Sequence, residues 1–127
     1  MAYRVLKVAA GAAVAAMLVG GPVLAHHSYA AFDRSKELTI TGVVDQLEWT
    51  NPHVWIFIWA PPPGGGPAVR WGFEGGGVGG MTRAGWRKNT IHPGEKITIT
   101  HNPMRNGSYG GSFLKAVLQN GKTVGDT

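Results

Sequence analysis

The alternation of apolar and polar positions predicts a chain built mainly of β-strands. Residues 38–49 form one long run whose apolar side chains lie at even positions before Gly42 and at odd positions near its end. A period of two is the pattern of a half-buried strand. Since a glycine at a change of phase inside a strand indicates a bulge or a strong bend, we expect this strand to be bent around residues 42–44.

The next run, residues 54–60, follows a turn at Thr50-Asn51-Pro52 and separates two kinds of side chain. One face of this strand carries Val54, Ile56 and Ile58, and the other carries the aromatic stripe, which is Trp55, Phe57 and Trp59. Residues 61–67 hold four prolines and three glycines, so they form a loop that cannot join a central strand.

The remaining pattern predicts three more strands and one short helix. The strands are expected at 68–74, 96–101 and 112–118, the helix at 81–88, and a brief return strand at 122–124 after the Asn120-Gly121 turn. Five strands with a helix between the third and fourth is the order of an OB-like barrel. We therefore expect a mainly β fold, a small five-stranded OB-like barrel with one short helix. An open meander or a small sandwich fits the pattern almost as well.

The first 25 residues have the features of a secretory signal peptide. Arg4 and Lys7 precede an uncharged run, residues 8–25, which ends in Val-Leu-Ala, with small residues where a signal peptidase reads. A membrane anchor is the competing interpretation, but Gly20, Gly21 and Pro22 would break such a helix near its end.

Cleavage after residue 25 predicts a periplasmic or secreted protein with no stable membrane anchor. The mature chain then has an irregular N-terminal arm, residues 26–35, and a single β-barrel-like domain, residues 36–127. The whole chain has 12 Lys+Arg against 7 Asp+Glu; losing Arg4 and Lys7 leaves 10 against 7, a net charge of +3. Nucleic-acid-binding proteins carry a larger, clustered positive charge, so no nucleic-acid partner is expected.

The sequence lacks the residues or motifs that several kinds of enzyme and binding site need. The chain has no cysteine, which excludes disulfides, thiolate metal sites and cysteine nucleophiles. No G-x-S-x-G elbow is present, and the acidic residues are scattered. Glu48 and His53 flank one turn, and such a pair more often orients a turn than moves a proton. The glycines at 75, 77 and 80 match G-x-G-x-x-G without the parallel βαβ unit that this motif needs. We expect a protein that is not an enzyme.

Histidines suggest one metal hypothesis. A chain cleaved after Ala25 begins with His26, whose α-amine and imidazole form a two-nitrogen grip suited to copper. His27 and His53 are the candidates to complete the site. The competing interpretation is a polar tail, with His53 in a local hydrogen bond and no cofactor at all. His92 and His101 are interpreted as structural or solvent-facing.

The aromatic stripe is the candidate ligand-binding surface. OB-like barrels stack bases or sugars on the second strand, where Trp55, Phe57 and Trp59 fall. The competing interpretation has loop 61–67 covering the stripe, with prolines packed on the indoles. We favour that covered arrangement, because an open apolar patch promotes aggregation.

Scattered motifs of the chain also resemble a known family. These are His26-His27-Ser28, Phe32-Asp33, the stretch 38–44, the stretch 48–53 (Glu-Trp-Thr-Asn-Pro-His) and Gly85-Trp86. They resemble a family of short exported bacterial proteins classed only as a domain of unknown function. The resemblance implies a periplasmic location and a small barrel-like fold, and it implies no activity. The glycines of 75–80 depart from the pattern where a better helix start is expected.

Together these features predict an exported periplasmic protein that works as a small non-enzymatic binding or accessory module. Its expected partner is an unidentified small molecule or a component of the envelope. A structural role in the envelope competes with this interpretation, and copper binding through a processed N-terminal histidine is the alternative.

Overall fold

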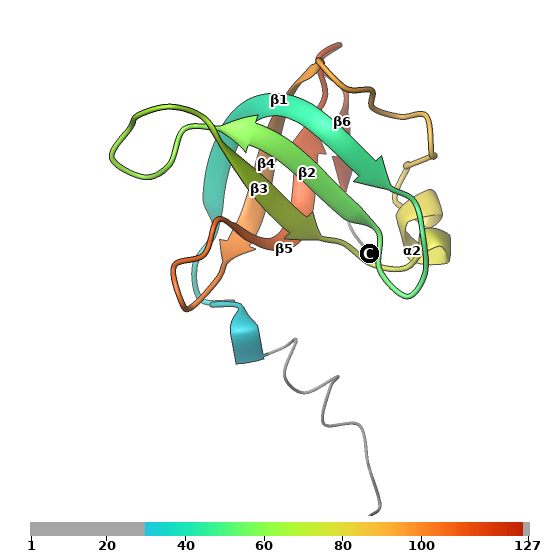
Figure 1. Cartoon of the computed structure of the whole chain (residues 1–127). Coiled ribbons are helices and arrows are strands. Elements are labelled where there is room, and N and C mark those ends of the chain that lie inside the picture. The colour runs from blue at the N-terminus through green and yellow to red at the C-terminus, as the bar shows by residue number, and fades with distance from the viewer. Residues whose placement is uncertain (1–29, 126–127) are drawn as a thin grey trace, which may run out of the picture.

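A long bent strand organises the fold. The computed structural model describes residues 30–125, which form a six-stranded sheet. In chain order the elements are β1 (Leu38–Glu48), β2 (Trp55–Ala60), β3 (Val69–Glu74), the helix α2 (Val78–Arg83), β4 (Lys96–Pro103), β5 (Gly110–Val117) and β6 (Thr123–Gly125). Figure 1 shows β1 curving around the other strands.

The strand order confirms the predicted OB-like barrel. The sheet runs β3-β2-β1-β4-β5-β6, and a parallel pairing of β3 with β5 closes the first five strands into a barrel. All other pairings are antiparallel. The short β6 pairs with the end of β5, as the Asn120-Gly121 turn predicts.

The bend of β1 lies slightly later than the sequence predicts. The first half of β1 pairs with β4 and the second half with β2, and the register with β2 shifts between Val44 and Gln46. Asp45 is therefore the extra residue of the bulge, not a residue around Gly42. Gly42 serves a different purpose, since a Cβ there would lie 2.5 Å from the carbonyl oxygen of Trp59.

Inward-facing side chains of every strand fill the barrel. The inner face predicted for residues 54–60 is confirmed, because Val54, just before β2, and Ile56 and Ile58 within it are all fully buried. Trp86, which follows α2, packs edge-on against Phe113 with ring centroids 5.4 Å apart. Its indole N–H donates to the carbonyl oxygen of Gly125 at 3.0 Å. A buried tryptophan thus keeps its polar atom satisfied while closing one end of the core.

The helix α2 differs from its prediction at both ends. It begins at Val78 rather than Met81 and ends at Arg83 rather than Lys88. The start is set by Asn51, whose side-chain oxygen accepts a hydrogen bond from the Val78 N–H at 2.9 Å. The end is set by Gly85, whose φ of +101° takes the chain out of the helix.

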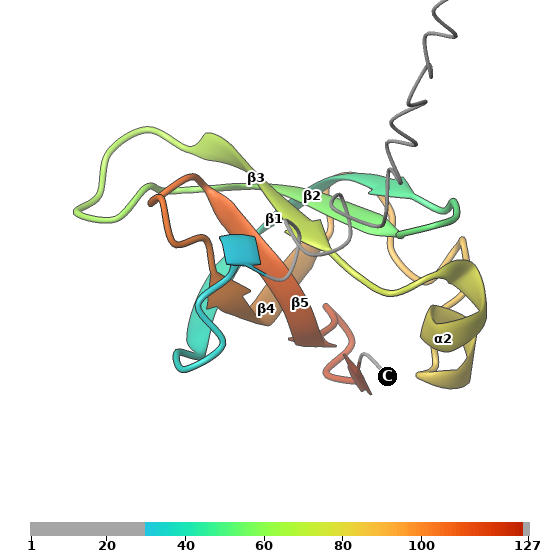
Figure 2. The same cartoon turned by 90° about the horizontal axis from the view of Figure 1, so that it is seen from below.

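The described part of the arm is attached to the domain. Phe32 forms an isolated bridge with Met104 and is 5% exposed. Asp33 N–H donates to the Pro103 carbonyl and Arg105 N–H donates to the Ala31 carbonyl, each at 2.8 Å. Figure 2 shows loop 61–67 and α2 at opposite ends of the barrel. Over residues 30–125, no helix is long and apolar enough to cross a membrane. The predicted signal peptide lies outside the described residues.

Candidate functional site

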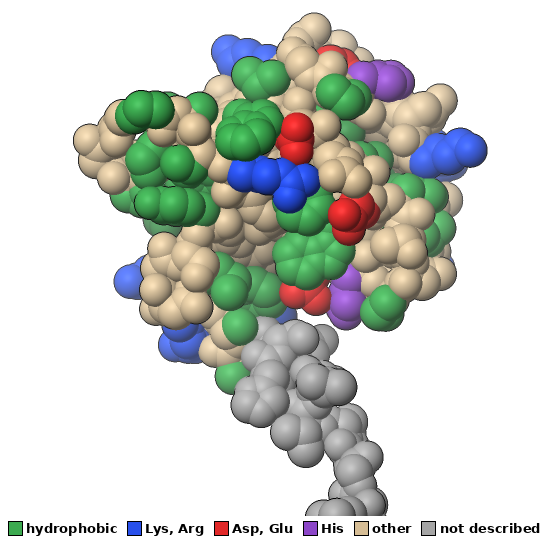
Figure 3. All heavy atoms as spheres, in the orientation of Figure 1, with side chains coloured by type: hydrophobic (Ala, Val, Ile, Leu, Met, Phe, Trp, Pro, Cys, Tyr) green, Lys and Arg blue, Asp and Glu red, His purple; other side chains and the backbone are tan. Residues whose placement is uncertain are grey.

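The aromatic stripe lies on the outer face of the barrel, as predicted. Pairing with β1 and β3 gives each ring one neighbour on either side. Trp55 lies between Glu48 and Glu74, Phe57 between Gln46 and Gly72, and Trp59 between Val43 and Arg70. Figure 3 shows hydrophobic side chains gathered on this face, with a basic group among them and acidic groups nearby.

Loop 61–67 does not cover the stripe, so the favoured sequence interpretation is wrong. Figure 1 shows the loop extending beyond the end of the barrel. Its first three prolines line a different cavity, described below. Trp59 remains 44% exposed. The prolines and the glycines at 64–66 continue away from β2 instead of folding back over it.

Arg70 covers the middle of the stripe instead. Its guanidinium carbon lies 3.9 Å from the centre of the Phe57 ring. The Nε–H donates to Asp45 Oδ2 at 2.8 Å, and an Nη2–H donates to Gln46 Oε1 at 3.1 Å. The bond from Arg70 holds the pKa of the Asp45 carboxyl below its usual range. The sequence signal for this contact is the alternation of 69–74, which places Arg70 on the outward face.

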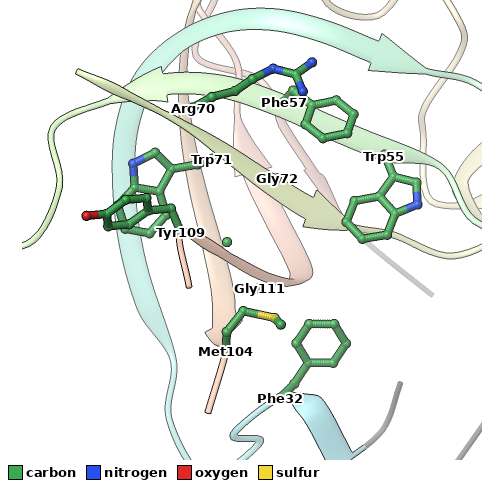
Figure 4. A pocket seen from close by; sticks show the side chains of 10 residues that line it. Phe32, Trp55, Phe57, Arg70, Trp71, Gly72, Met104, Tyr109 and Gly111 are labelled. Carbon is green, nitrogen blue, oxygen red and sulfur yellow. The ribbon is translucent and has the colours of Figure 1, made fainter. Parts of the chain in front are cut away.

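Beside Arg70 the stripe opens into an aromatic groove with a volume of about 300 Å³. Trp55 and Phe57 stack nearly parallel in one wall, with centroids 6.0 Å apart and planes at 11°. Figure 4 shows their rings facing the opening, with Phe32 and Met104 on the opposite side. The residues bordering the aromatic groove are Phe32, Trp55, Phe57, Arg70, Trp71, Gly72, Met104, Tyr109, Gly110 and Gly111.

Glycines form the floor of the aromatic groove. Gly72 and Gly110 are partners in the parallel β3–β5 pairing. A Cβ on Gly110 would overlap the Gly72 carbonyl oxygen, and a Cβ on Gly72 would lie 3.0 Å from the Phe57 ring. Side chains at these positions would push the strands apart and fill the opening. The same residues therefore close the barrel and give the groove its depth.

A second cavity of about 430 Å³ lies beside loop 61–67 and shares Trp71, Met104 and Gly110 with the groove. His101 lines it and is 2% exposed, so it is a structural residue and not a solvent-facing one. Its ring centroid lies 4.8 Å from that of Phe73. Within the described residues, His101 Nδ1 has no hydrogen-bond partner. Burial lowers the pKa of this imidazole, which favours the neutral form.

Only one of the three candidate copper ligands lies within the described residues. His53 Nδ1–H donates to the Gly75 carbonyl at 3.0 Å, so this atom has a structural partner. The carboxylate beside it is Glu74, at 3.4 Å, rather than the Glu48 of the sequence prediction. Among residues 30–125, no group of three or more His, Asp or Glu is placed to hold a metal ion. His26 and His27 lie outside this range, and the copper hypothesis stays a prediction.

Comparison with known proteins gives one match. Residues 13–113 match the model of a family described as "Family of unknown function (DUF6152)". Curated proteins yield no match, and neither do solved structures.

Proposed function

The chain belongs to this family of unknown function, and we propose that it serves as a small non-enzymatic binding module whose ligand lies in the aromatic groove. The observation that carries the proposal is a hollow on the barrel surface whose walls are aromatic rings already held in place.

The rings of the aromatic groove are available and ordered. Trp55 and Phe57 are half-buried, belong to the outer face of the barrel and border the groove, where Arg70 covers one face of Phe57. Arg70 fixes Phe57 from one side, and Asp45 and Gln46 fix Arg70. A wall that is ordered before binding loses little side-chain entropy when the ligand arrives. The volume lies at the lower end of the range of small-molecule pockets, about 300–1,000 Å³.

The position on the fold also favours binding. OB-fold proteins bind ligands on the face of strands 2 and 3, flanked by the loop between strands 4 and 5. Here β2 and β3 supply Trp55, Phe57 and Arg70, and the segment between β4 and β5 supplies Met104 and Tyr109. This is an analogy of fold, and the groove itself supplies the chemical argument.

We further propose that the protein works in the periplasm, on the basis of the leader features of residues 1–25. A small envelope protein without a catalytic role would capture a small molecule or act as an accessory to a larger partner. Fractionation of expressing cells tests this proposal. An exported protein is expected in the periplasmic fraction, with an intact mass that lacks residues 1–25.

Binding is tested by titrating a small-molecule library against the protein, with tryptophan fluorescence and ligand-observed NMR as readouts. Trp55→Ala is expected to lower the affinity for any groove ligand at least about tenfold, a loss of about 1.4 kcal/mol of binding free energy. Val117→Ala is the control, because it removes an exposed hydrophobic side chain of β5 outside the groove. Trp59 also lies outside the groove, but its side chain bonds Asp45, which holds Arg70. If Trp55→Ala lowers the melting temperature but leaves every ligand's affinity unchanged, the groove is not the binding site.

A further inference from the structure

The charges around Trp55 indicate the chemistry of the ligand. We infer that the aromatic groove takes a small organic ammonium ion, held against Trp55 at the edge of the groove farthest along β2 from Arg70. Glu48 and Glu74 do not line the groove but are the cross-strand neighbours of Trp55 at that edge. This inference rests on the proposed binding function and names its ligand class.

Two carboxylates flank the Trp55 position. Glu48 on β1 and Glu74 on β3 are its direct cross-strand partners. Directly opposite residues of an antiparallel pair have Cβ atoms about 4.5–5.5 Å apart on the same face. Trp55 therefore projects from the sheet with an acidic side chain on each side. An aromatic face next to negative charge is the arrangement that attracts an organic cation.

A cation already lies against an aromatic face and a carboxylate at the next outward-facing position of β2, which is Phe57. At Phe57 the aromatic face is occupied by the Arg70 guanidinium, which pairs with Asp45. The guanidinium carbon lies 3.9 Å from the centre of the ring. At Trp55 the ring and the carboxylates come from the protein. Glu74 lies 3.4 Å from His53 Nδ1, and among the ion pairs of residues 30–125 no Lys or Arg pairs with Glu48 or Glu74. A ligand cation would complete the second arrangement.

The local charge runs against the average of the chain. The whole sequence carries a net charge of +5. Around the stripe, three carboxylates (Asp45, Glu48 and Glu74) face one guanidinium (Arg70), which leaves two negative charges when His53, beside Glu74, is counted as neutral. Such a surface repels polyanions such as nucleic acids, and it raises the local concentration of cations.

The opposite wall suits methylated ammonium groups. Phe32 and Met104 face Trp55 and Phe57 across the aromatic groove (Figure 4). Aromatic cages of this kind are the usual site for quaternary ammonium ligands, and a thioether adds a polarisable surface. A volume of about 300 Å³ suits a compact cation rather than a folded polymer.

The test compares choline with 3,3-dimethylbutan-1-ol, which has the same shape without the charge. In calorimetric titrations of the full chain, choline is expected to bind at least about tenfold more tightly, equivalent to about 1.4 kcal/mol. Added salt is expected to weaken choline binding and leave the neutral alcohol unaffected. Equal affinities for the two compounds would overturn the inference.

Variants locate the charge effect. Glu48→Gln and Glu74→Gln are each expected to lower choline affinity several-fold without changing the affinity of the neutral alcohol. Glu95→Gln is the matched control, since it removes one carboxylate near His92, outside the groove. If only neutral compounds of the library bind at Trp55, the ammonium inference fails and the binding function survives. If no compound binds there, both fail.

Discussion

Gly110 and Gly72 approach so closely across the β3–β5 pairing that a Cβ on Gly110 would overlap the Gly72 carbonyl oxygen. This pair is one of the three residue pairs by which β3 and β5 close the barrel. It also forms the floor of the aromatic groove. Fold closure and the candidate site consequently depend on the same pair of residues.

Gly110→Ala is expected to destabilise the protein by about 2–4 kcal/mol, because the new Cβ meets backbone and the residue has a φ of +153°. Gly107→Ala is the matched control: its φ is +78°, but nothing lies within 4 Å of a Cβ there. It should lose only about 1 kcal/mol, the cost of backbone strain alone. Urea unfolding measures both, and equal losses would contradict the role of the close approach.

Asn51→Ala is expected to cost about 1 kcal/mol, because the Val78 N–H at the start of α2 loses its acceptor. Asn51→Asp should retain most of the stability, since a carboxylate oxygen accepts the same bond. Thermal unfolding compares the three proteins. An alanine variant as stable as the aspartate variant would show that the bond does not set the start of the helix.

Arg70→Gln is expected to raise the pKa of Asp45 towards its usual value, because the Arg70 hydrogen bond is the main cause of the lowered pKa. The pKa of Asp33, lowered chiefly by its bonds from Ser35, should not move. NMR titration of both carboxyl groups gives the two values in one experiment. If both pKa values shift, or neither does, the Arg70–Asp45 ion pair is not what lowers the pKa of Asp45.

Folding stability is expected to fall when the pH drops from about 7 to about 5, through His101. Burial makes the folded-state pKa of His101 lower than its unfolded value, which is about 6.5. As the pH falls, His101 of the unfolded chain therefore takes up a proton before His101 of the folded protein does. The stabilisation that is present above the unfolded-state pKa is lost as the pH falls towards the folded-state pKa.

The variant His101→Leu should have a flatter stability profile over this pH interval, whatever its absolute stability. Denaturant unfolding at a series of pH values measures the slopes. A slope that survives in His101→Leu would assign the effect to another group.

The local pattern of the chain was enough to predict the strands and their order. In β2 the alternation of aliphatic and aromatic residues determines which side chains enter the core, since successive side chains of a strand point to opposite faces. The helix between the third and fourth strands and the return strand after Asn120-Gly121 also follow from local signals. These features depend on neighbours in the sequence, so the sequence alone determines them.

Only the tertiary structure decided the candidate site and the ends of α2. Asn51 lies 27 residues before the helix that it caps, and no local pattern at 75–80 reveals it. Phe57 acquires its cation from β3, and His53 meets Glu74 rather than Glu48. The opposite wall of the aromatic groove, with Phe32 and Met104, forms because the arm pairs with the end of β4. Each of these contacts joins segments far apart in the chain, and barrel closure brings them together.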